Sequence, residues 1–198
     1  MPDQVFFPVS ALLALLLVVL ALDPFTKRVP TGPVSAADRT VHNMTLSGQD
    51  LYRFTLGNVG ELAIEGKKDQ ETLSITLQAD EAYDNPRYGT FIAFDESVEF
   101  AYQGRRIRVT VTARSAGQFP ASQFQANYSV GSRGESGWNT FDLTNEFKDY
   151  SFEYEVPYAN RGLGLDYLAV RPVVPEKERT VEISKLHIKS LTPPRPKS

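Results

Sequence analysis

Residues 106–130 read RIRVTVTARSAGQFPASQFQANYSV, and this stretch decides the fold because apolar and polar residues alternate along two successive runs. Ile107, Val109 and Val111 would share one face of the first run, and Phe124 and Tyr128 would share one face of the second. A period of two is typical of strands that bury one face and expose the other to water. The stretch therefore predicts two strands of a half-buried antiparallel sheet.

The same alternation recurs on both sides of this stretch, at residues 72–78, 150–156 and 181–188. In the last run the alternation changes phase at Ser184 and Lys185, which predicts a β-bulge there. No ten-residue window in this region has the 3.6-residue period of an amphipathic helix. We expect about nine to eleven short strands packed as an antiparallel β-sandwich. Turn-forming residues separate the runs at 84–86, 103–104, 131–134 and 160–162.

The N-terminal region is of a different kind, since residues 5–22 carry no charge and are rich in Leu, Ala and Val. As a helix they would span about 27 Å, close to the thickness of a bilayer core. No Lys or Arg precedes them, and the residues after Leu22 suit cleavage poorly, so we expect an uncleaved anchor rather than a signal peptide. The expected organisation is a short tail (1–4), a transmembrane signal-anchor helix (5–22), a Pro-rich linker (23–37), a β-sandwich domain (38–191) and a disordered tail (192–198).

The composition excludes several classes of function. The 198 residues include no cysteine and two histidines, and the formal net charge is −3. Disulfides and Cys-ligated metal sites are therefore impossible, and nothing suggests a nucleic-acid partner. No nucleophile elbow, P-loop or dinucleotide motif is present. Glu153 and Glu155 have the spacing of glycosidase carboxylates, but alternating Glu also keeps a strand face soluble. We expect no catalytic residue and no metal site, the latter because His42 and His187 have no Cys or spaced carboxylate beside them.

Four segments together resemble one family. They are residues 103–115, QGRRIRVTVTARS; 138–154, WNTFDLTNEFKDYSFEY; 166–172, DYLAVRP; and 180–186, TVEISKL. Their order is similar to that of the jelly-roll carbohydrate-binding modules with a galactose-binding-like fold, over residues 100–190. Phe147 stands where that family often has a second Trp. Ser184 and Lys185 replace a usual pair of Asp, which argues against the structural calcium site that the resemblance implies, and we expect no other cofactor.

The resemblance implies a glycan ligand, held on a concave sheet face or in the neighbouring loops. Sugars are recognised by aromatic faces and by amide, carboxylate and guanidinium groups. An amide row on residues 123–127, a polar loop that ends at the only Trp, and two loops rich in Tyr, Asn and Arg supply such groups. The alternatives are that the amides cover a solvated face and that the Trp packs against the sandwich. The candidate ligand-binding residues are Gln123, Gln125, Asn127, Arg133, Trp138, Tyr83, Arg87, Tyr88 and Tyr158.

These observations predict a membrane-anchored, non-catalytic module that binds an envelope or extracellular glycan. Lys27 and Arg28 follow the apolar segment and would by themselves favour a cytoplasmic domain. The resemblance favours the opposite orientation, with the domain periplasmic or extracellular and the chain crossing the membrane once. The alternative is an accessory subunit of a membrane complex, in which the helix docks to partner helices and the sandwich makes protein–protein contacts.

Overall fold

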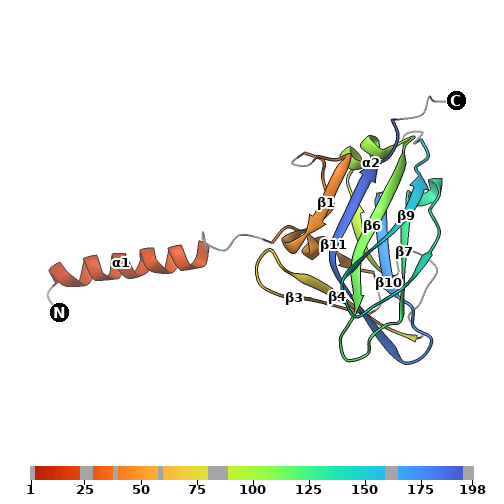
Figure 1. Ribbon diagram of the computed structural model, residues 1–198. Helices are drawn as coiled ribbons and strands as arrows, with labels where there is room; N and C mark the ends of the chain where they lie inside the picture. Colours follow the sequence, from red (N-terminus) through yellow and green to blue (C-terminus); the bar gives the residue numbers. More distant parts are fainter. Residues whose placement is uncertain are drawn as a thin grey trace.

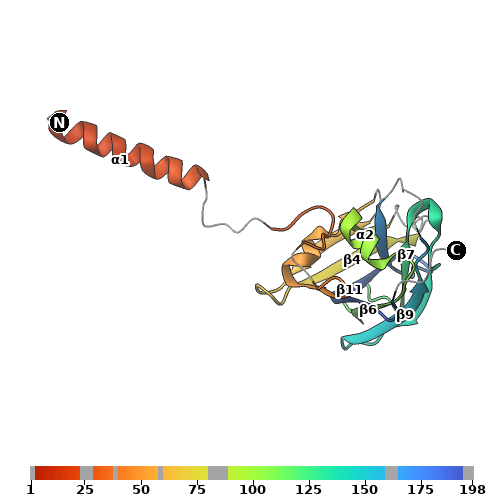
Figure 2. The ribbon, with the colours of Figure 1, turned by 90° about the horizontal axis from the view of Figure 1, so that it is seen from above.

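The computed structural model describes residues 3–22, 29–37, 40–57, 60–79, 89–158 and 165–193. Eleven strands within these ranges form two antiparallel sheets that pack face to face, as Figures 1 and 2 show. The expected antiparallel jelly-roll β-sandwich is thereby confirmed. Helix α1 (Asp3–Leu22) lies apart from both sheets in the two views.

The larger sheet has six strands, and we call it the β6 sheet. Its order is β3 (Glu61–Glu65), β4 (Thr72–Gln78), β11 (Glu178–Ser190), β6 (Arg106–Ser115) and β9 (Lys148–Glu155), with β1 (Asn43–Ser47) paired to β11. The five-stranded β10 sheet has the order β2 (Thr55–Leu56), β5 (Thr90–Phe94), β10 (Asp166–Pro172), β7 (Gln123–Ser129) and β8 (Asn139–Asp142). The first strand thus lies beside the last strand of the chain, as Figure 1 shows.

The predicted bulge in β11 is confirmed, since the register of β11 against β6 shifts between Ile183 and Lys185. The shift allows apolar residues on both sides of it to face the core, and Ile183 and Leu186 are both fully buried. The bulge also marks the point along one edge of β11 at which its neighbouring strand changes from β4 to β1. Strand β4 pairs with the residues up to Ile183, and β1 pairs with the residues from Lys185 onward.

The core lies between the inner faces of the sheets and joins the apolar residues of all the alternating runs. Leu73, Val109, Phe124 and Leu168 come from four different strands and are fully buried. Each such side chain contributes about 1.5–3 kcal/mol when it leaves water. The ring of Tyr128 stacks on that of Phe94 with centroids 5.8 Å apart. Because the inner faces are filled in this way, a ligand site has to lie on an outer face or at an end.

One helix of the domain was not expected. Helix α2 (Glu96–Tyr102) follows β5, and the Asp95 carboxylate caps it by accepting hydrogen bonds from the backbone N–H groups of Ser97 and Val98. Its Tyr102 is buried and donates a hydrogen bond of 2.6 Å to the carbonyl of Val41. Seven residues make two helical turns, which is too short for an amphipathic period to stand out in the sequence.

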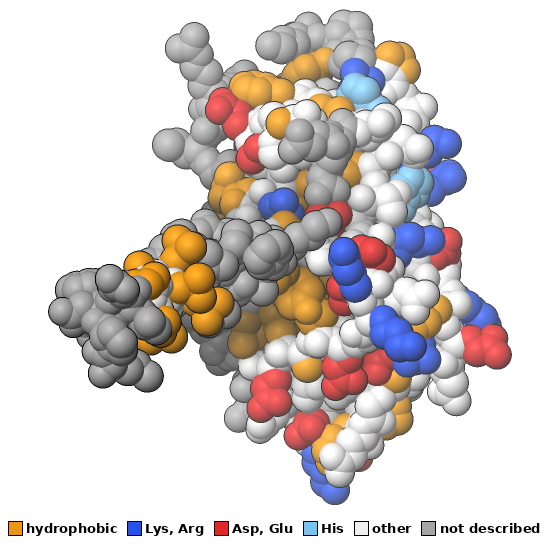
Figure 3. All heavy atoms as spheres, turned by 90° about the vertical axis from the view of Figure 1, so that its left-hand side faces the viewer, with side chains coloured by type: hydrophobic (Ala, Val, Ile, Leu, Met, Phe, Trp, Pro, Cys, Tyr) orange, Lys and Arg blue, Asp and Glu red, His pale blue; other side chains and the backbone are white. Residues whose placement is uncertain are grey.

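The N-terminal helix differs from the domain in its exposure. The described side chains of α1, residues 8–17, are all exposed, and hydrophobic groups cover this part of the helix in Figure 3. No helix in the described part of the chain combines the length and the hydropathy that crossing a membrane requires. Helix α1 thus covers residues 5–22, but the described residues contain no helix that meets the requirements of the expected transmembrane helix.

The segment assigned to the linker is ordered where it is described. Val34 is fully buried and forms a bridge to Phe94, so the chain already lies beside β5 before residue 38. The backbone N–H of Val34 donates to the carbonyl of Ala93 at 2.8 Å, and its carbonyl accepts from the N–H of Asp95 at 2.9 Å. Residues 23–28 and 194–198 lie outside the described ranges.

Candidate functional site

The outer face of the β10 sheet brings together several of the residues that the sequence analysis selected. On β7, the core residues alternate with Gln123, Gln125 and Asn127, which therefore point away from the core. The register places Arg171 of β10 opposite Gln125. We call this surface the outer β10 face. It comprises Phe91, Gln123, Gln125, Asn127, Trp138, Tyr167 and Arg171.

Arg171, near the end of β10, contacts Trp138, which directly precedes the edge strand β8. The guanidinium carbon of Arg171 lies 3.9 Å from the centroid of the Trp138 ring, a cation–π contact. Arg171 Nε donates a hydrogen bond of 2.9 Å to Gln125 Oε1, and Gln125 Nε2 donates one of 3.1 Å to Thr140 Oγ1. The indole, the guanidinium and the amide are therefore held in fixed orientations, while the indole keeps partial exposure.

The other two amides of the row have partners within the protein. Asn127 is fully buried, donates 2.9 Å to Glu135 Oε2 and accepts from Ser136 Oγ at 3.3 Å. Gln123 Nε2 donates to Asp142 Oδ1 at 2.7 Å on the exposed edge strand β8. Of the three amides, Gln123 and Gln125 keep partial exposure, so they are the ones that a ligand could reach.

Two more aromatic rings lie on the same face. Tyr167 and Phe91, on neighbouring strands β10 and β5, meet edge to face with centroids 5.1 Å apart. Tyr167 is mostly buried, whereas Phe91 is half-buried. Aromatic rings next to planar amides and a guanidinium are the groups that recognise a sugar, whose C–H surface stacks on a ring while its hydroxyls exchange hydrogen bonds.

The structure places the remaining candidates elsewhere. Arg133 lies in the short 3₁₀ helix η3 (Gly131–Arg133) and turns toward the end of the sandwich, where Nη2 donates to Asp166 Oδ1 at 3.0 Å. Tyr158 packs over Gly104, in the turn between α2 and β6. Tyr83, Arg87 and Tyr88 lie outside the described residues.

Arg133 belongs to a buried cluster of charged groups. Its guanidinium also lies 3.5 Å from Glu99 Oε2, and Tyr128 donates from its hydroxyl to Asp166 Oδ2 at 3.2 Å. Burial, together with the negative charge of Glu99, raises the pKa of Asp166 to about 7, although Arg133 and Tyr128 act in the opposite direction. The hydrogen bonds of this cluster join α2, β7 and β10, so it fixes one end of the sandwich.

Glu153, one of the two carboxylates considered for catalysis, forms surface ion pairs. Glu153 Oε1 accepts from Arg108 at 2.6 Å, and its Oε2 lies 2.8 Å from Arg106. The hydrogen bond from Arg108 lowers the pKa of Glu153, with the charges of both arginines adding to it. A carboxylate held ionised in this way is a poor proton donor, which a glycosidase acid must be.

The region of the bulge does not fit the structural calcium that the resemblance implies. Ser184 and Lys185 occupy the expected acidic positions, and the Lys185 ammonium lies 3.9 Å from Asp149 Oδ1. Calcium takes six to eight oxygen ligands, and an ammonium at the site would repel it. Within the ranges that the structure describes, no group of three or more His, Asp or Glu residues could hold a metal ion.

Sequence reasoning missed Phe91, Tyr167 and Arg171. The sequence contains a clue to two of them in residues 166–172, DYLAVRP, because Tyr167 and Arg171 are four positions apart and must share a face of a strand. The face to which they belong is hard to recognise from the sequence, because every residue of β10 is buried, including those on the outer face. Alternation in burial is therefore absent from this strand.

Comparisons with known proteins bear on the fold. The sequence matches no protein-family model and no curated protein. Among solved structures, the CBM22-1 xylan-binding domain of Paenibacillus barcinonensis Xyn10C is similar, with a TM-score of 0.51 and 7% identity over 76% of this chain and 94% of that one. The tandem CBM22-1–CBM22-2 domain of the same protein gives a TM-score of 0.50 and 7% identity over 72% of this chain and 42% of that one. The chain therefore has the jelly-roll β-sandwich fold of carbohydrate-binding modules.

Proposed function

We propose that this chain is a non-catalytic carbohydrate-binding module that holds an envelope or extracellular glycan on the outer β10 face. The observation that carries the proposal is the Trp138 ring, fixed by Arg171 and partly exposed beside the Gln125 amide. A fixed ring loses little conformational entropy on binding, so the contact with a sugar ring contributes more to affinity. The fold supports the proposal, since the similar domain of Xyn10C is described as xylan-binding.

The groups on the face suit a neutral glycan. Gln123 and Gln125 can each donate to and accept from sugar hydroxyls, and the exposed Thr140 adds a hydroxyl on the neighbouring strand. The guanidinium of Arg171 is held against Trp138 and bonded to Gln125, so its role on this face is to fix the ring and the amide. Stacking would supply the affinity, and the amides would select the pattern of hydroxyls.

The test is binding of the full chain, kept in detergent, to a panel of soluble xylan, β-glucan, mannan and peptidoglycan fragments, measured by affinity electrophoresis and calorimetry. We expect at least one neutral glycan to bind and Trp138→Ala to weaken it about tenfold or more. Phe100→Ala is the matched control, because Phe100 is a 62% exposed aromatic residue on α2 and outside the face. Absence of binding to the whole panel, or equal affinity of Trp138→Ala and the wild type, would contradict the proposal.

We also propose that residues 5–22 attach the chain to a membrane and that the domain lies outside the cytoplasm. The support is the uncharged sequence and the exposure of the apolar side chains of residues 8–17, with Leu12 71% exposed. An apolar helix whose described side chains, those of residues 8–17, are all exposed needs an apolar environment. We expect Leu13→Arg/Leu16→Arg to release the chain from native membranes washed at high pH, and a reporter fused after Ser198 to read outside the cytoplasm. Retention of the double variant, or a cytoplasmic reading, would contradict this part.

A further inference from the structure

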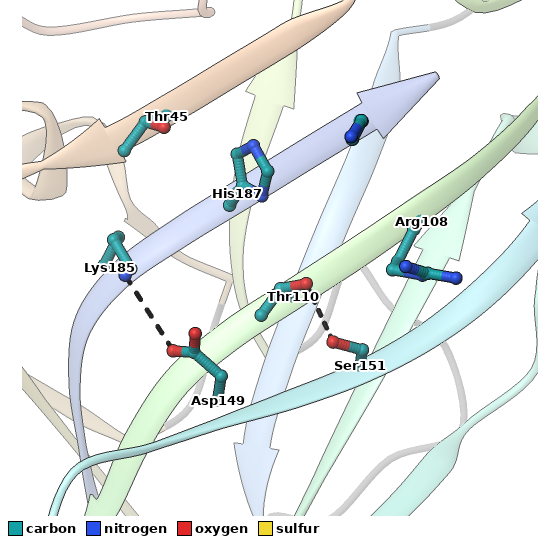
Figure 4. A pocket seen from close by; sticks show the side chains of 8 residues that line it. Thr45, Arg108, Thr110, Asp149, Ser151, Lys185 and His187 are labelled. Atoms are coloured by element: carbon teal, nitrogen blue, oxygen red, sulfur yellow. Dashed lines mark hydrogen bonds and ion pairs between the residues drawn. The ribbon is translucent and has the colours of Figure 1, made fainter. Parts of the chain in front are cut away.

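The outer face of the β6 sheet contains a hollow that the proposed function does not use. Four neighbouring strands in the order β1, β11, β6 and β9 line it. Their register places Thr45, His187, Thr110 and Ser151 in one row across the sheet, as Figure 4 shows. We call this pocket of about 450 Å³ the His187 hollow. Its lining residues are Thr45, Arg108, Thr110, Asp149, Ser151, Lys185, His187 and Lys189.

The shape of the hollow follows from the lengths of its side chains. The short hydroxyl residues Thr45, Thr110 and Ser151 form the floor, and long cationic residues stand in the rows on either side. Lys189 and Arg108 are opposite each other in one flanking row, and Lys185 lies in the other. A volume of this size exceeds what a single small anion needs and suits one or two sugar rings.

The cations of the hollow are incompletely neutralised. Arg108 is paired with Glu153 at 2.6 Å, but Lys185 reaches Asp149 only at 3.9 Å. Lys189 is exposed and forms no ion pair with any residue in the described part of the chain. Ion pairs at this exposure contribute little, so both ammonium groups remain available to an anionic ligand.

The imidazole of His187 lies between these two lysines on β11. Its Nε2 donates to Asn43 Oδ1 at 2.8 Å, since an amide oxygen can only accept. Burial lowers the pKa of His187, and the charges of Lys185 and Lys189 lower it further, while Asp149 on β9 acts in the opposite direction. Arg108 on β6 is paired with Glu153 on β9, and the groups of β1 near the ring are the neutral Asn43 and Thr45. The two lysines therefore disfavour the protonated form of the ring, and a bound anion would offset their charge.

We propose that the His187 hollow binds an acidic saccharide, a sugar that carries a carboxylate. The carboxylate lies between the ammonium groups of Lys185 and Lys189, and sugar hydroxyls exchange hydrogen bonds with Thr110 and Ser151 on the floor. The hydroxyl floor favours a saccharide over a bare anion, and the net negative charge of the chain argues against nucleic acid. The site lies on the opposite sheet from the outer β10 face and does not depend on it.

The direct test is calorimetry of the full chain in detergent with tri-galacturonate, its methyl ester and inorganic phosphate at low salt. We expect tri-galacturonate to bind, the ester and phosphate to bind at least about tenfold more weakly, and Lys185→Gln/Lys189→Gln to lose about tenfold in affinity. The control is Lys67→Gln/Lys68→Gln, which removes the same charge at the exposed β3–β4 turn. Equal binding of the ester or of phosphate, or no effect of Lys185→Gln/Lys189→Gln, would overturn the proposal.

A second readout is the titration of His187 by NMR, which is simple because the chain has two histidines. A carboxylate between the lysines should raise the pKa of His187 and leave that of His42 unchanged. A pKa of His187 that is the same with and without saturating tri-galacturonate would overturn the proposal. Binding of the neutral glycan panel is measured on the same samples. If tri-galacturonate fails while a neutral glycan binds, only the His187 hollow is rejected.

Discussion

Asp166 is the residue whose protonation should control stability. Its pKa in the folded state is raised to about 7 from the ordinary 3.8 by burial and by Glu99. The folded chain therefore binds a proton more tightly than the unfolded chain. The resulting stabilisation is fully present below about pH 4 and is lost as the pH rises through about 7.

We therefore expect the free energy of unfolding to fall between about pH 4 and pH 7 more steeply in the wild type than in Asp166→Asn. Urea unfolding of the full chain in detergent at a series of pH values measures this. The difference between the two proteins isolates Asp166 from His42 and His187, whose lowered pKa values act with the opposite sign. Asp142→Asn, at an exposed position, is the control. A wild-type curve parallel to that of Asp166→Asn would show that the folded pKa of Asp166 is not raised.

Gly104 is a position where only glycine fits. Its φ of +66° lies in the left-handed region, and a Cβ would collide with the ring of Tyr158. We expect Gly104→Ala to lower the free energy of unfolding by at least about 2 kcal/mol. Gly89→Ala is the matched control, because a Cβ there meets nothing within 4 Å, and we expect a change within about 0.5 kcal/mol. Equal stability of the two variants in urea unfolding would show that Tyr158 does not pack on Gly104.

At the level of single residues, the sequence could identify Gln125 and Trp138 because a strand alternates and because the chain has one Trp. It could not identify Arg171 as their partner, since the register between β7 and β10 depends on long-range pairing. Arg133 illustrates the same limit. Its loop is polar and typical of a binding site, but Asp166 and Glu99 lie more than thirty residues away in the sequence and neutralise it.

Among the elements, the strands that bury one face were predictable and the others were not. Runs 72–78 and 181–188 correspond to β4 and to the central part of β11, because their inner residues are apolar and their outer residues polar. Strand β10 is buried on both faces, and β2 has two residues, so neither carries alternation. Helix α2 depends on the Asp95 cap and on burial of Val98, and its seven residues are too few to show a helical period in the sequence.

The bulge in β11 allows a sharp test of register. Ser184 is the extra residue, because Ile183 pairs with Ala113 while Lys185 pairs with Thr112. Its deletion would leave Ile183 and Leu186 facing the core in regular alternation, so we expect the variant lacking Ser184 to fold with a moderate loss of stability. Deletion of Thr110 from β6 is the control, because it would turn half of that strand inside out and prevent folding. Circular dichroism and cooperative unfolding distinguish the two. Loss of folding on deletion of Ser184 would show that the bulge itself is required.

For the whole molecule, the two sheets present two chemically different outer faces. The outer β10 face combines aromatic rings and amides, whereas the His187 hollow combines hydroxyls and ammonium groups. A sandwich permits this because each sheet shares only its inner face with the core. Binding at the first face should depend little on salt, and binding at the second should weaken steeply with it. The two sites can therefore be separated in one protein by ionic strength alone.

The extent of the folding unit can be tested by truncation on either side of Val34. A chain that begins at residue 29 lacks α1, which lies apart from both sheets, and should keep the free energy of unfolding of the full chain. A chain that begins at residue 38 also loses the buried Val34 and its two backbone hydrogen bonds, to Ala93 of β5 and to Asp95. It loses as well the carbonyls of residues 31–33 that accept from Arg53. We expect this second truncation to cost about 2–4 kcal/mol in urea unfolding. Equal stability of the two truncated chains would place residues 29–37 in a linker, as the sequence first indicated, whereas the expected loss would make them the first paired segment of the sandwich.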